Sequence, residues 1–429
     1  MKVFKRQVAV IIVVIVTLTL IVPIQAFAVN VGGREVSSSG ACIIDFDTGI
    51  MLYGHEADTP RVPASMTKLV TAYVVYDAIR AEEISIDDTT QISQGVSDLS
   101  YNLQYSNVPL PVGSSVTIRE LLDVSIIMSA CAATVALGEA LYGSEEALVA
   151  RMNEKVLRLG INAQFFDSYG VSAQNSITPR GMTKLTRYLI LNYPEILEVA
   201  SRESVTFSGV EYKNTNLLLG EYTGADGLKT GFTNAAGFCF VGTAQRGDRR
   251  IIAVTMGSTQ TSRFPDTTVL LDYGFANARN TINEFQQNSK ATPSPANLIL
   301  DGEEVPLNAY LIGGSHYFRL RDIALLMRDT NYQFDVAWSS SDRAVYINTN
   351  TPYFSSETLR PDIIDEVRQY VPAMSRFFLD GVEYALDVYI IEGSNYFRLR
   401  DFERLIGFHV SWIGETRTVI INTHSQQAA

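Results

Sequence analysis

The sequence contains few of the residues that build disulfide frameworks, metal centres and histidine-dependent catalytic sites. Of its 429 residues only three are cysteines and four are histidines. The cysteines, Cys42, Cys131 and Cys239, are odd in number and widely spaced, so at least one thiol is free or pairs between chains. No pair of cysteines or histidines has zinc-binding spacing, and no glycine-rich loop is suited to holding a phosphate. We therefore expect neither a metal nor a cofactor, and a Ser-His-Asp triad has no obvious base.

Positive charge is also scarce. Lysine and arginine total 34 against 46 aspartates and glutamates, which gives a formal net charge of -12. A nucleic-acid-binding protein needs a basic face, so nucleic acid is not an expected partner. Hydrophobic residues make up 46% of the chain, which is enough to bury a sizeable core. The length predicts two or three domains.

The first residues predict export. A basic start is followed by an apolar run from Val8 to Val22 and by the small-x-small sequence Ala26-Phe27-Ala28. This layout is typical of a secretory signal peptide, here residues 1–28. The alternative is a retained membrane anchor, but the apolar run is short for a span of about 20 residues. We expect the mature chain to act outside the cell or on the cell-wall side of the cytoplasmic membrane.

Sequence patterns between residues 40 and 257 predict an α/β arrangement. Residues 40–54 form two apolar runs around an Asp-Thr-Gly turn and predict a strand hairpin. A helix is expected over 65–80, and the capping box Thr117–Glu120 opens another. Residues 226–257 predict a three-stranded antiparallel meander. Together these elements indicate an antiparallel sheet layered with helices.

The C-terminal part contains an internal repeat. A polar, proline-containing run at 285–296 predicts a linker between a catalytic domain at 30–284 and a repeat domain at 297–425. Tyr317–Asp322 recurs as Tyr396–Asp401, an offset of 79. The closing segment 345–349 recurs as 419–423, an offset of 74. We expect two small α+β copies, at about 297–350 and 375–425, that are marginal alone and pack together.

The sequence Ser65-Met66-Thr67-Lys68 places a serine and a lysine three residues apart at the start of a predicted helix. This spacing puts both side chains on one helix face, within reach of each other. Serine needs a nearby base to become a nucleophile, and a lysine serves as that base when burial lowers its pKa. The motif alone is weak evidence, because exposed serines and lysines often have this spacing.

Two further motifs strengthen this interpretation. Ser129-Ala130-Cys131 follows Ser65 by 64 residues and lies between two predicted helical runs. Lys229-Thr230-Gly231 lies 100 residues further on, in the first strand of the predicted meander. This order of three motifs characterises serine β-lactamases and penicillin-binding proteins. The glycine beside Lys229 would let a substrate backbone approach, so that the lysine can anchor a carboxylate.

The residues around these motifs resemble the low-molecular-weight D-alanyl-D-alanine carboxypeptidases, the S11 serine peptidases. The similarity is carried by Pro63–Tyr73, Thr178–Leu185 and Gly224–Thr233, and it covers roughly residues 35–280. It implies a β-lactamase/transpeptidase-like antiparallel sheet flanked by helices. It also implies removal of the terminal D-alanine from peptidoglycan stem peptides through an acyl-enzyme, with β-lactam antibiotics as covalent inhibitors.

The resemblance further implies a role for each motif residue. Ser65 would attack the carbonyl of the penultimate D-alanine, Lys68 would activate it, and Ser129 would relay a proton to the leaving amine. The remaining residues would bind substrate. Lys229 and Thr230 would hold the terminal carboxylate, the backbone N–H groups of Ser65 and Phe232 would form the oxyanion hole beside Gly231, and Arg263 would be a second carboxylate contact.

Cys131 departs from the family pattern, which usually has asparagine at this position. A thiol is a poor hydrogen-bond donor and acceptor, so the substitution bears on the rate. It leaves open a catalytically impaired cell-wall-binding protein. A D,D-transpeptidase or weak β-lactamase also stays open, although Phe165–Asn175 offers no glutamate of the kind that class A β-lactamases use for deacylation.

The C-terminal repeats resemble the stalk-type domain named after the N-terminal region of copper amine oxidases. The first copy has His316 and the second has His409 and His424, all at non-equivalent positions, so we do not expect copper. Tyrosines and arginines in both copies suggest contact with cell-wall glycan. The alternative, which we favour, is that Tyr317, Phe318, Tyr396 and Phe397 form the core of the repeats.

Overall fold

The computed structural model describes residues 28–307, 309–340, 344–349, 351–354, 366–373, 375–384 and 386–424. The predicted signal peptide lies outside these residues, apart from Ala28. Within the described ranges no helix combines the length and the apolar character needed to cross a membrane.

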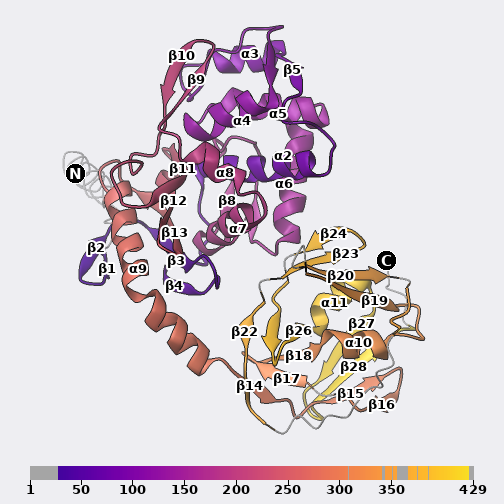
Figure 1. Cartoon of the computed structure of the whole chain (residues 1–429). Coiled ribbons are helices and arrows are strands. Elements are labelled where there is room, and N and C mark those ends of the chain that lie inside the picture. The colour runs from indigo at the N-terminus through magenta and orange to yellow at the C-terminus, as the bar shows by residue number, and fades with distance from the viewer. Residues whose placement is uncertain are drawn as a thin grey trace, which may run out of the picture.

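A five-stranded antiparallel sheet is the centre of the N-terminal part (Figure 1). Its strand order is β11 (Ala225–Thr233), β12 (Gly237–Arg246), β13 (Arg249–Ser258), β3 (Gly40–Asp45) and β4 (Met51–His55). The predicted meander supplies β11 to β13, and the predicted hairpin supplies β3 and β4. Pairing of β13 with β3, for example Val254 opposite Cys42, joins segments that are 200 residues apart into one sheet.

Helices cover both faces of this sheet. Helix α9 (Arg263–Asn288) packs on β13, β12, β3 and β4, whereas α7 (Pro179–Asn192) packs against β13 and β3.

The other helices of the N-terminal part are η1 (Ala64–Thr67), α2 (Lys68–Arg80), α3 (Gln94–Ser100), α4 (Ile118–Ile127), α5 (Cys131–Tyr142), α6 (Glu145–Arg158) and α8 (Glu195–Ala200). Short strand pairs connect these elements: β1 (Val29–Val31) with β2 (Arg34–Val36), β5 (Thr89–Gln91) with β6 (Ser115–Thr117), β7 (Ala163–Gln164) with β8 (Ser176–Ile177), and β9 (Ser204–Phe207) with β10 (Val210–Lys213).

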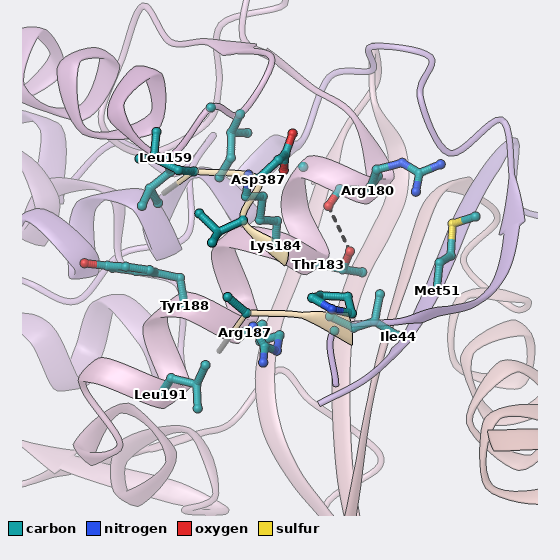
Figure 2. A pocket seen from close by; sticks show the side chains of 18 of the residues that line it. Ile44, Met51, Leu159, Arg180, Thr183, Lys184, Arg187, Tyr188, Leu191 and Asp387 are labelled. Atoms are coloured by element: carbon teal, nitrogen blue, oxygen red, sulfur yellow. Dashed lines mark hydrogen bonds between the residues drawn. The ribbon is translucent and has the colours of Figure 1, made fainter. Parts of the chain in front are cut away.

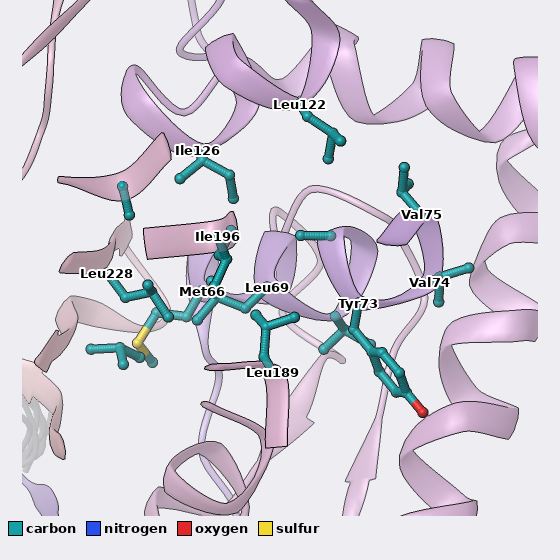
Figure 3. Close-up of a cluster of buried hydrophobic side chains, with 14 of the residues drawn as sticks. Met66, Leu69, Tyr73, Val74, Val75, Leu122, Ile126, Leu189, Ile196 and Leu228 are labelled. Carbon is teal, nitrogen blue, oxygen red and sulfur yellow. The ribbon is translucent and has the colours of Figure 1, made fainter. Parts of the chain in front are cut away.

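Helix α2 runs through the middle of the main hydrophobic core. Its first eleven residues include ten buried side chains, because apolar residues occur on every side of the helix rather than on one stripe. Figure 3 shows Leu69 and Tyr73 beside Leu189, with Met66 lying near Leu228 of β11. A helix enclosed in this way holds Lys68, its first residue, and the preceding η1 turn with Ser65 in a fixed place.

The C-terminal part confirms the expectation that the two repeats pack together. A seven-stranded sheet has the order β21 (Arg368–Gln369), β14 (Lys290–Pro293), β17 (Ala309–Ile312), β18 (Ser315–Arg319), β26 (Ser394–Arg398), β25 (Tyr389–Ile391) and β22 (Val371–Pro372). At its centre β18 and β26, the same segment of each copy, pair antiparallel with Phe318 opposite Phe397. Tyr317, Phe318, Tyr396 and Phe397 are all buried, so their interpretation as core residues is confirmed.

The two copies exchange hairpins. The opening hairpin of the first copy, β15 (Asn297–Leu300) and β16 (Glu303–Val305), joins the closing strands of the second, β27 (His409–Ile413) and β28 (Thr418–Asn422). The opening hairpin of the second copy, β23 (Arg376–Leu379) and β24 (Val382–Tyr384), joins β19 (Phe334–Ser339) and β20 (Ala344–Thr349) of the first. Each repeat also has one short helix, α10 (Leu320–Leu326) or α11 (Leu399–Ile406). Because each sheet uses strands from both copies, neither copy is complete alone.

The predicted linker at 285–296 has regular structure instead. Residues 285–288 are the last turn of α9, and β14 begins at Lys290. Tertiary contacts order this polar run: the Phe285 ring packs edge-on against Tyr370 with centroids 6.1 Å apart, and Ala291 is fully buried. The polar composition of this segment predicts a linker without regular structure. Its few apolar side chains contact the repeats and order it instead.

The repeats also touch the N-terminal part directly. The Tyr188 hydroxyl donates a 2.6 Å hydrogen bond to Glu383, which Arg376 also binds. A cavity of about 920 Å³ lies alongside, lined by residues from both parts. Figure 2 shows Lys184, Arg187 and Tyr188 of α7 in its wall. Neither Ser65 nor any other predicted catalytic residue lines this cavity.

Candidate active site

Ser65 and Lys68 meet at the junction of η1 and α2. Ser65 lies in η1 and is partly exposed, whereas Lys68 is the first residue of α2 and is fully buried. The Lys68 amine donates a hydrogen bond to Ser65 Oγ at 3.0 Å and another to the Tyr169 carbonyl oxygen at 2.7 Å. The three-residue spacing thus brings the two side chains into direct contact, as the sequence predicts.

Burial lowers the pKa of the Lys68 amine below its ordinary value of 10.5. Removal of water disfavours the charged form, and the nearby Cys131 and Asp167 side chains oppose this effect only in part. A larger fraction of the amine is therefore neutral at a given pH. A neutral amine 3.0 Å from a hydroxyl is able to accept its proton.

The middle motif reaches the same place from the start of α5. Ser129 precedes the helix with a left-handed backbone (φ 72°) and is 5% exposed. Cys131 is the first residue of α5, and its Sγ lies 3.5 Å from Lys68 Nζ. The Cys131 N–H donates to the Ser106 carbonyl oxygen at 2.9 Å, which fixes the turn. The thiol therefore lies beside the Lys68 amine.

The third motif places a second buried lysine on β11. Lys229 is 1% exposed and donates to the Thr230 carbonyl oxygen at 3.1 Å. Burial lowers its pKa well below 10.5, and the charge of Lys68 lowers it further. The described residues provide it with no carboxylate partner at ion-pair distance. An anionic group of a substrate would supply the missing counter-charge.

Gly231 allows β11 to run directly against the backbone at Ser65. A Cβ at this position would lie 2.9 Å from the Pro63 carbonyl oxygen and 3.0 Å from the Ser65 nitrogen. Only glycine permits such an approach without displacing backbone. The next residue, Phe232, is 50% exposed and its ring stacks on Phe238 with centroids 4.2 Å apart.

Arg263 is the first residue of α9. Its guanidinium lies over the rings of Phe264 and Phe238, at 4.5 and 5.3 Å from their centroids. Its Nε is buried without a hydrogen-bond partner in the described structure. Arg263 is also one of the charges that lower the pKa of Lys229, so the two cations share one electrostatic environment.

Two contributors to the site were missed by sequence reasoning. The Asp167 carboxylate accepts hydrogen bonds from the backbone N–H groups of residues 169–172, and the resulting tight loop aims the Tyr169 carbonyl at Lys68. Thr215 accepts a 2.7 Å hydrogen bond from the Thr230 hydroxyl. The sequence contains a signal for this loop. Asp167 lies two residues before Tyr169, and aspartate side chains often accept hydrogen bonds from backbone N–H groups just downstream, which predicts a tight turn. The sequence contains no such signal for Thr215.

Residues 26–260 match the model of the D-alanyl-D-alanine carboxypeptidase family. The chain belongs to this family. It is a serine-type D-Ala-D-Ala carboxypeptidase with the mixed α/β fold of the penicillin-binding proteins.

Individual relatives agree with this assignment. A D-alanyl-D-alanine carboxypeptidase of Bacillus subtilis is 31% identical over 263 residues, which cover 59% of this chain and 67% of that protein. The solved penicillin-binding protein of Listeria monocytogenes in its ampicillin-bound form has 32% identity and a TM-score of 0.50, covering 56% of this chain and 98% of the other. A Streptomyces DD-transpeptidase structure has 31% identity and a TM-score of 0.53, covering 57% and 98%. These matches leave much of the repeat region uncovered.

Proposed function

We propose that the chain removes the terminal D-alanine from peptidoglycan stem peptides through an acyl-enzyme on Ser65. The observation that carries this proposal is the 3.0 Å contact between Ser65 Oγ and the buried, pKa-lowered amine of Lys68. Few surface serines have such a base within reach, and this pair provides the nucleophile and its proton acceptor.

The remaining steps follow from the positions of the other motif residues. As Ser65 Oγ attacks the penultimate D-alanine carbonyl, its proton passes to Lys68. The backbone N–H groups of Ser65 and Phe232 would stabilise the oxyanion, and Ser129 would relay a proton to the departing D-alanine amine. Lys229, Thr230 and Arg263 would hold the substrate's terminal carboxylate. Water then hydrolyses the ester and frees Ser65.

The same chemistry makes β-lactams covalent inhibitors, because their strained amide is attacked in place of the peptide. We propose that penicillin forms an adduct on Ser65, in line with solved relatives described in ampicillin- and cefotaxime-bound forms. Labelling with a fluorescent penicillin should be lost in Ser65→Ala and kept in the matched control Ser262→Ala, which alters a serine outside the three motifs. Labelling that persists in the Ser65→Ala protein would show that the nucleophile is misidentified.

A second activity, D,D-transpeptidation, is favoured by the similarity to a protein described as a DD-transpeptidase. The two reactions share the acyl-enzyme and differ in the acceptor. Incubating the enzyme with a stem pentapeptide and an excess of glycine separates them, since hydrolysis yields the tetrapeptide and transfer yields a glycine-terminated product.

We also propose that the chain is exported by its N-terminal segment and works at the cell wall, with the C-terminal repeats in contact with the wall. The basic and apolar layout of residues 1–28 supports export. Detecting the mature N-terminus near residue 29 in secreted material would test this proposal.

A further inference from the structure

The two tryptophans of the chain occupy equivalent positions in the two repeats. Trp338 lies on β19 and Trp412 on β27, and their offset of 74 equals that of the closing strands. Their pairing is also the same: Trp338 lies opposite Val345, and Trp412 lies opposite Val419. A residue type that occurs twice in 429 positions thus appears at one structural position in both copies.

Both tryptophan rings are open to solvent. Trp338 is 53% exposed and Trp412 is 44% exposed, although the repeats have a buried aromatic core that would accommodate large rings. An exposed tryptophan adds nothing to a hydrophobic core. A large apolar face with an N–H at its edge is instead typical of a binding surface.

A pocket surrounds Trp412. It has a volume of about 320 Å³ and is lined by residues of both copies, among them His316, Arg400 and Ser411. The His316 ring lies 4.9 Å from the Trp412 ring, and its Nδ1 is 2.8 Å from the Ser294 hydroxyl. The pocket therefore combines an aromatic wall with several hydrogen-bonding groups.

Two residues of this pocket have polar counterparts in the other copy. Arg321 corresponds to Arg400 and Asn395 to His316, both at the repeat offset of 79. Arg321 and Arg400 are exposed and have no ion-pair partner among the described residues, whereas the neighbouring Arg398 is paired with Asp401. The hairpin exchange pairs β15 of the first copy with the second copy's β28, which in turn pairs with β27, so the sheet that carries Trp412 is built from both repeats.

We propose that the faces around Trp412 and Trp338 are two related binding sites for the glycan strand of peptidoglycan. A pyranose ring presents a C–H face that stacks on an aromatic ring, while its hydroxyl and acetamido groups need hydrogen-bond partners such as arginine, histidine or asparagine. A glycan strand repeats the same sugars along its length, so both sites would recognise the same ligand. Linked weak sites raise overall affinity by about 10²- to 10⁴-fold.

The choice of this ligand rests on the proposed function, because the stem peptides that the enzyme trims are attached to glycan strands. The sites themselves are separate from the active site, since none of their residues belongs to the three catalytic motifs. Binding through the repeats would keep the catalytic domain close to its immobilised substrate.

Intrinsic fluorescence provides a direct test in the full-length protein, because all tryptophan emission comes from the two proposed sites. We expect purified glycan strands, freed of stem peptides by an amidase, to quench or shift this emission in a saturable manner. Trp412→Phe and Trp338→Phe each leave a single reporter, so the sites are observed one at a time. Unchanged emission at saturating glycan would overturn the proposal.

Pull-down with purified sacculi gives an independent measurement. We expect Trp412→Ala or Trp338→Ala to weaken binding about 10-fold or more, and the double variant to lose it. Phe354→Ala is the matched control, since Phe354 is an 82% exposed aromatic residue elsewhere in the repeats. All variants should keep wild-type penicillin acylation, which separates this proposal from the proposed function. Two results would contradict the glycan proposal. One is that the double variant binds sacculi as strongly as wild type, and the other is that the protein binds only sacculi that retain anionic wall polymers.

Discussion

Lys68, the base in the proposed mechanism, has a thiol beside it. Cys131 Sγ lies 3.5 Å from Lys68 Nζ and 3.8 Å from the Ser129 carbonyl oxygen, where the family usually has an asparagine amide. An amide both donates and accepts strong hydrogen bonds, whereas a thiol does both weakly. The position of the side chain is thus kept while its hydrogen-bonding capacity is reduced.

Replacing this thiol should not damage the enzyme. Cys131→Asn is expected to keep penicillin acylation and to raise its rate by up to about 10- to 150-fold, the value of one regained hydrogen bond to a charged group in the transition state. Stopped-flow acylation kinetics measure this, with Cys239→Ser as a control at another buried thiol. An inactive Asn variant would mean that the role assigned to Cys131 is wrong.

The pH dependence of acylation should report the Lys68 amine. Because only the neutral amine accepts the serine proton, the rate should rise with pH through the Lys68 pKa and then level off. Burial lowers this pKa below 10.5, so the plateau should begin at a lower pH than an ordinary lysine would allow. A rate that is flat from pH 5 to 10 would argue against Lys68 as the base.

At the scale of elements, the site depends on backbones that approach each other closely. The loop at residues 167–172 lies against η1, and Gly170 has a left-handed φ of 91°. A Cβ there would lie 2.0 Å from the Ala64 carbonyl oxygen, next to the nucleophile. The loop also carries the Tyr169 carbonyl that binds Lys68.

Gly170→Ala should therefore reduce both stability and acylation. Left-handed backbone costs a non-glycine residue about 1–2 kcal/mol, and the clash with Ala64 adds to this cost. Gly209→Ala is the matched control, since Gly209 has a φ of 78° but nothing within 4 Å of its would-be Cβ. Urea unfolding and acylation rates should show a larger loss for Gly170→Ala on both measures. Equal losses for the two variants would show that the contact with Ala64 is unimportant.

At the scale of the whole molecule, catalysis and the repeats use different cores. The three motifs lie within the N-terminal part, whereas the repeats are built around separate hydrophobic clusters. Direct links between the parts include the Tyr188–Glu383 hydrogen bond and the packing of Phe285 on Tyr370. Such contacts orient the repeats without contributing atoms to the active site.

A chain ending at Asn288, the last residue of α9, should still react with penicillin at a rate within about two-fold of the full-length protein. The cut is placed there because α9 covers the catalytic sheet and must be kept. Acylation kinetics together with far-ultraviolet circular dichroism check this expectation. A truncated protein that folds but no longer acylates would show that the repeats support the site.

The sequence by itself determined the chemistry and the local elements. Ser65 and Lys68 share a helix face because of their spacing, and the capping box at Thr117 and Glu120 forms as the pattern predicts. These features depend on neighbours a few residues apart, so short-range rules are sufficient to predict them. The strands of the meander were predictable for the same reason.

The tertiary structure decided what depends on distant segments. Only folding brings Cys131 and the Tyr169 carbonyl to Lys68, pairs β13 with β3, and orders the polar run at 285–296 through Phe285 and Ala291. The exchange of hairpins between the repeats, which places Trp338 and Trp412 on equivalent faces, also lies beyond local patterns. The sequence of a strand indicates that it pairs but not with which strand. Its partner is decided by burial and by segments far away in the chain.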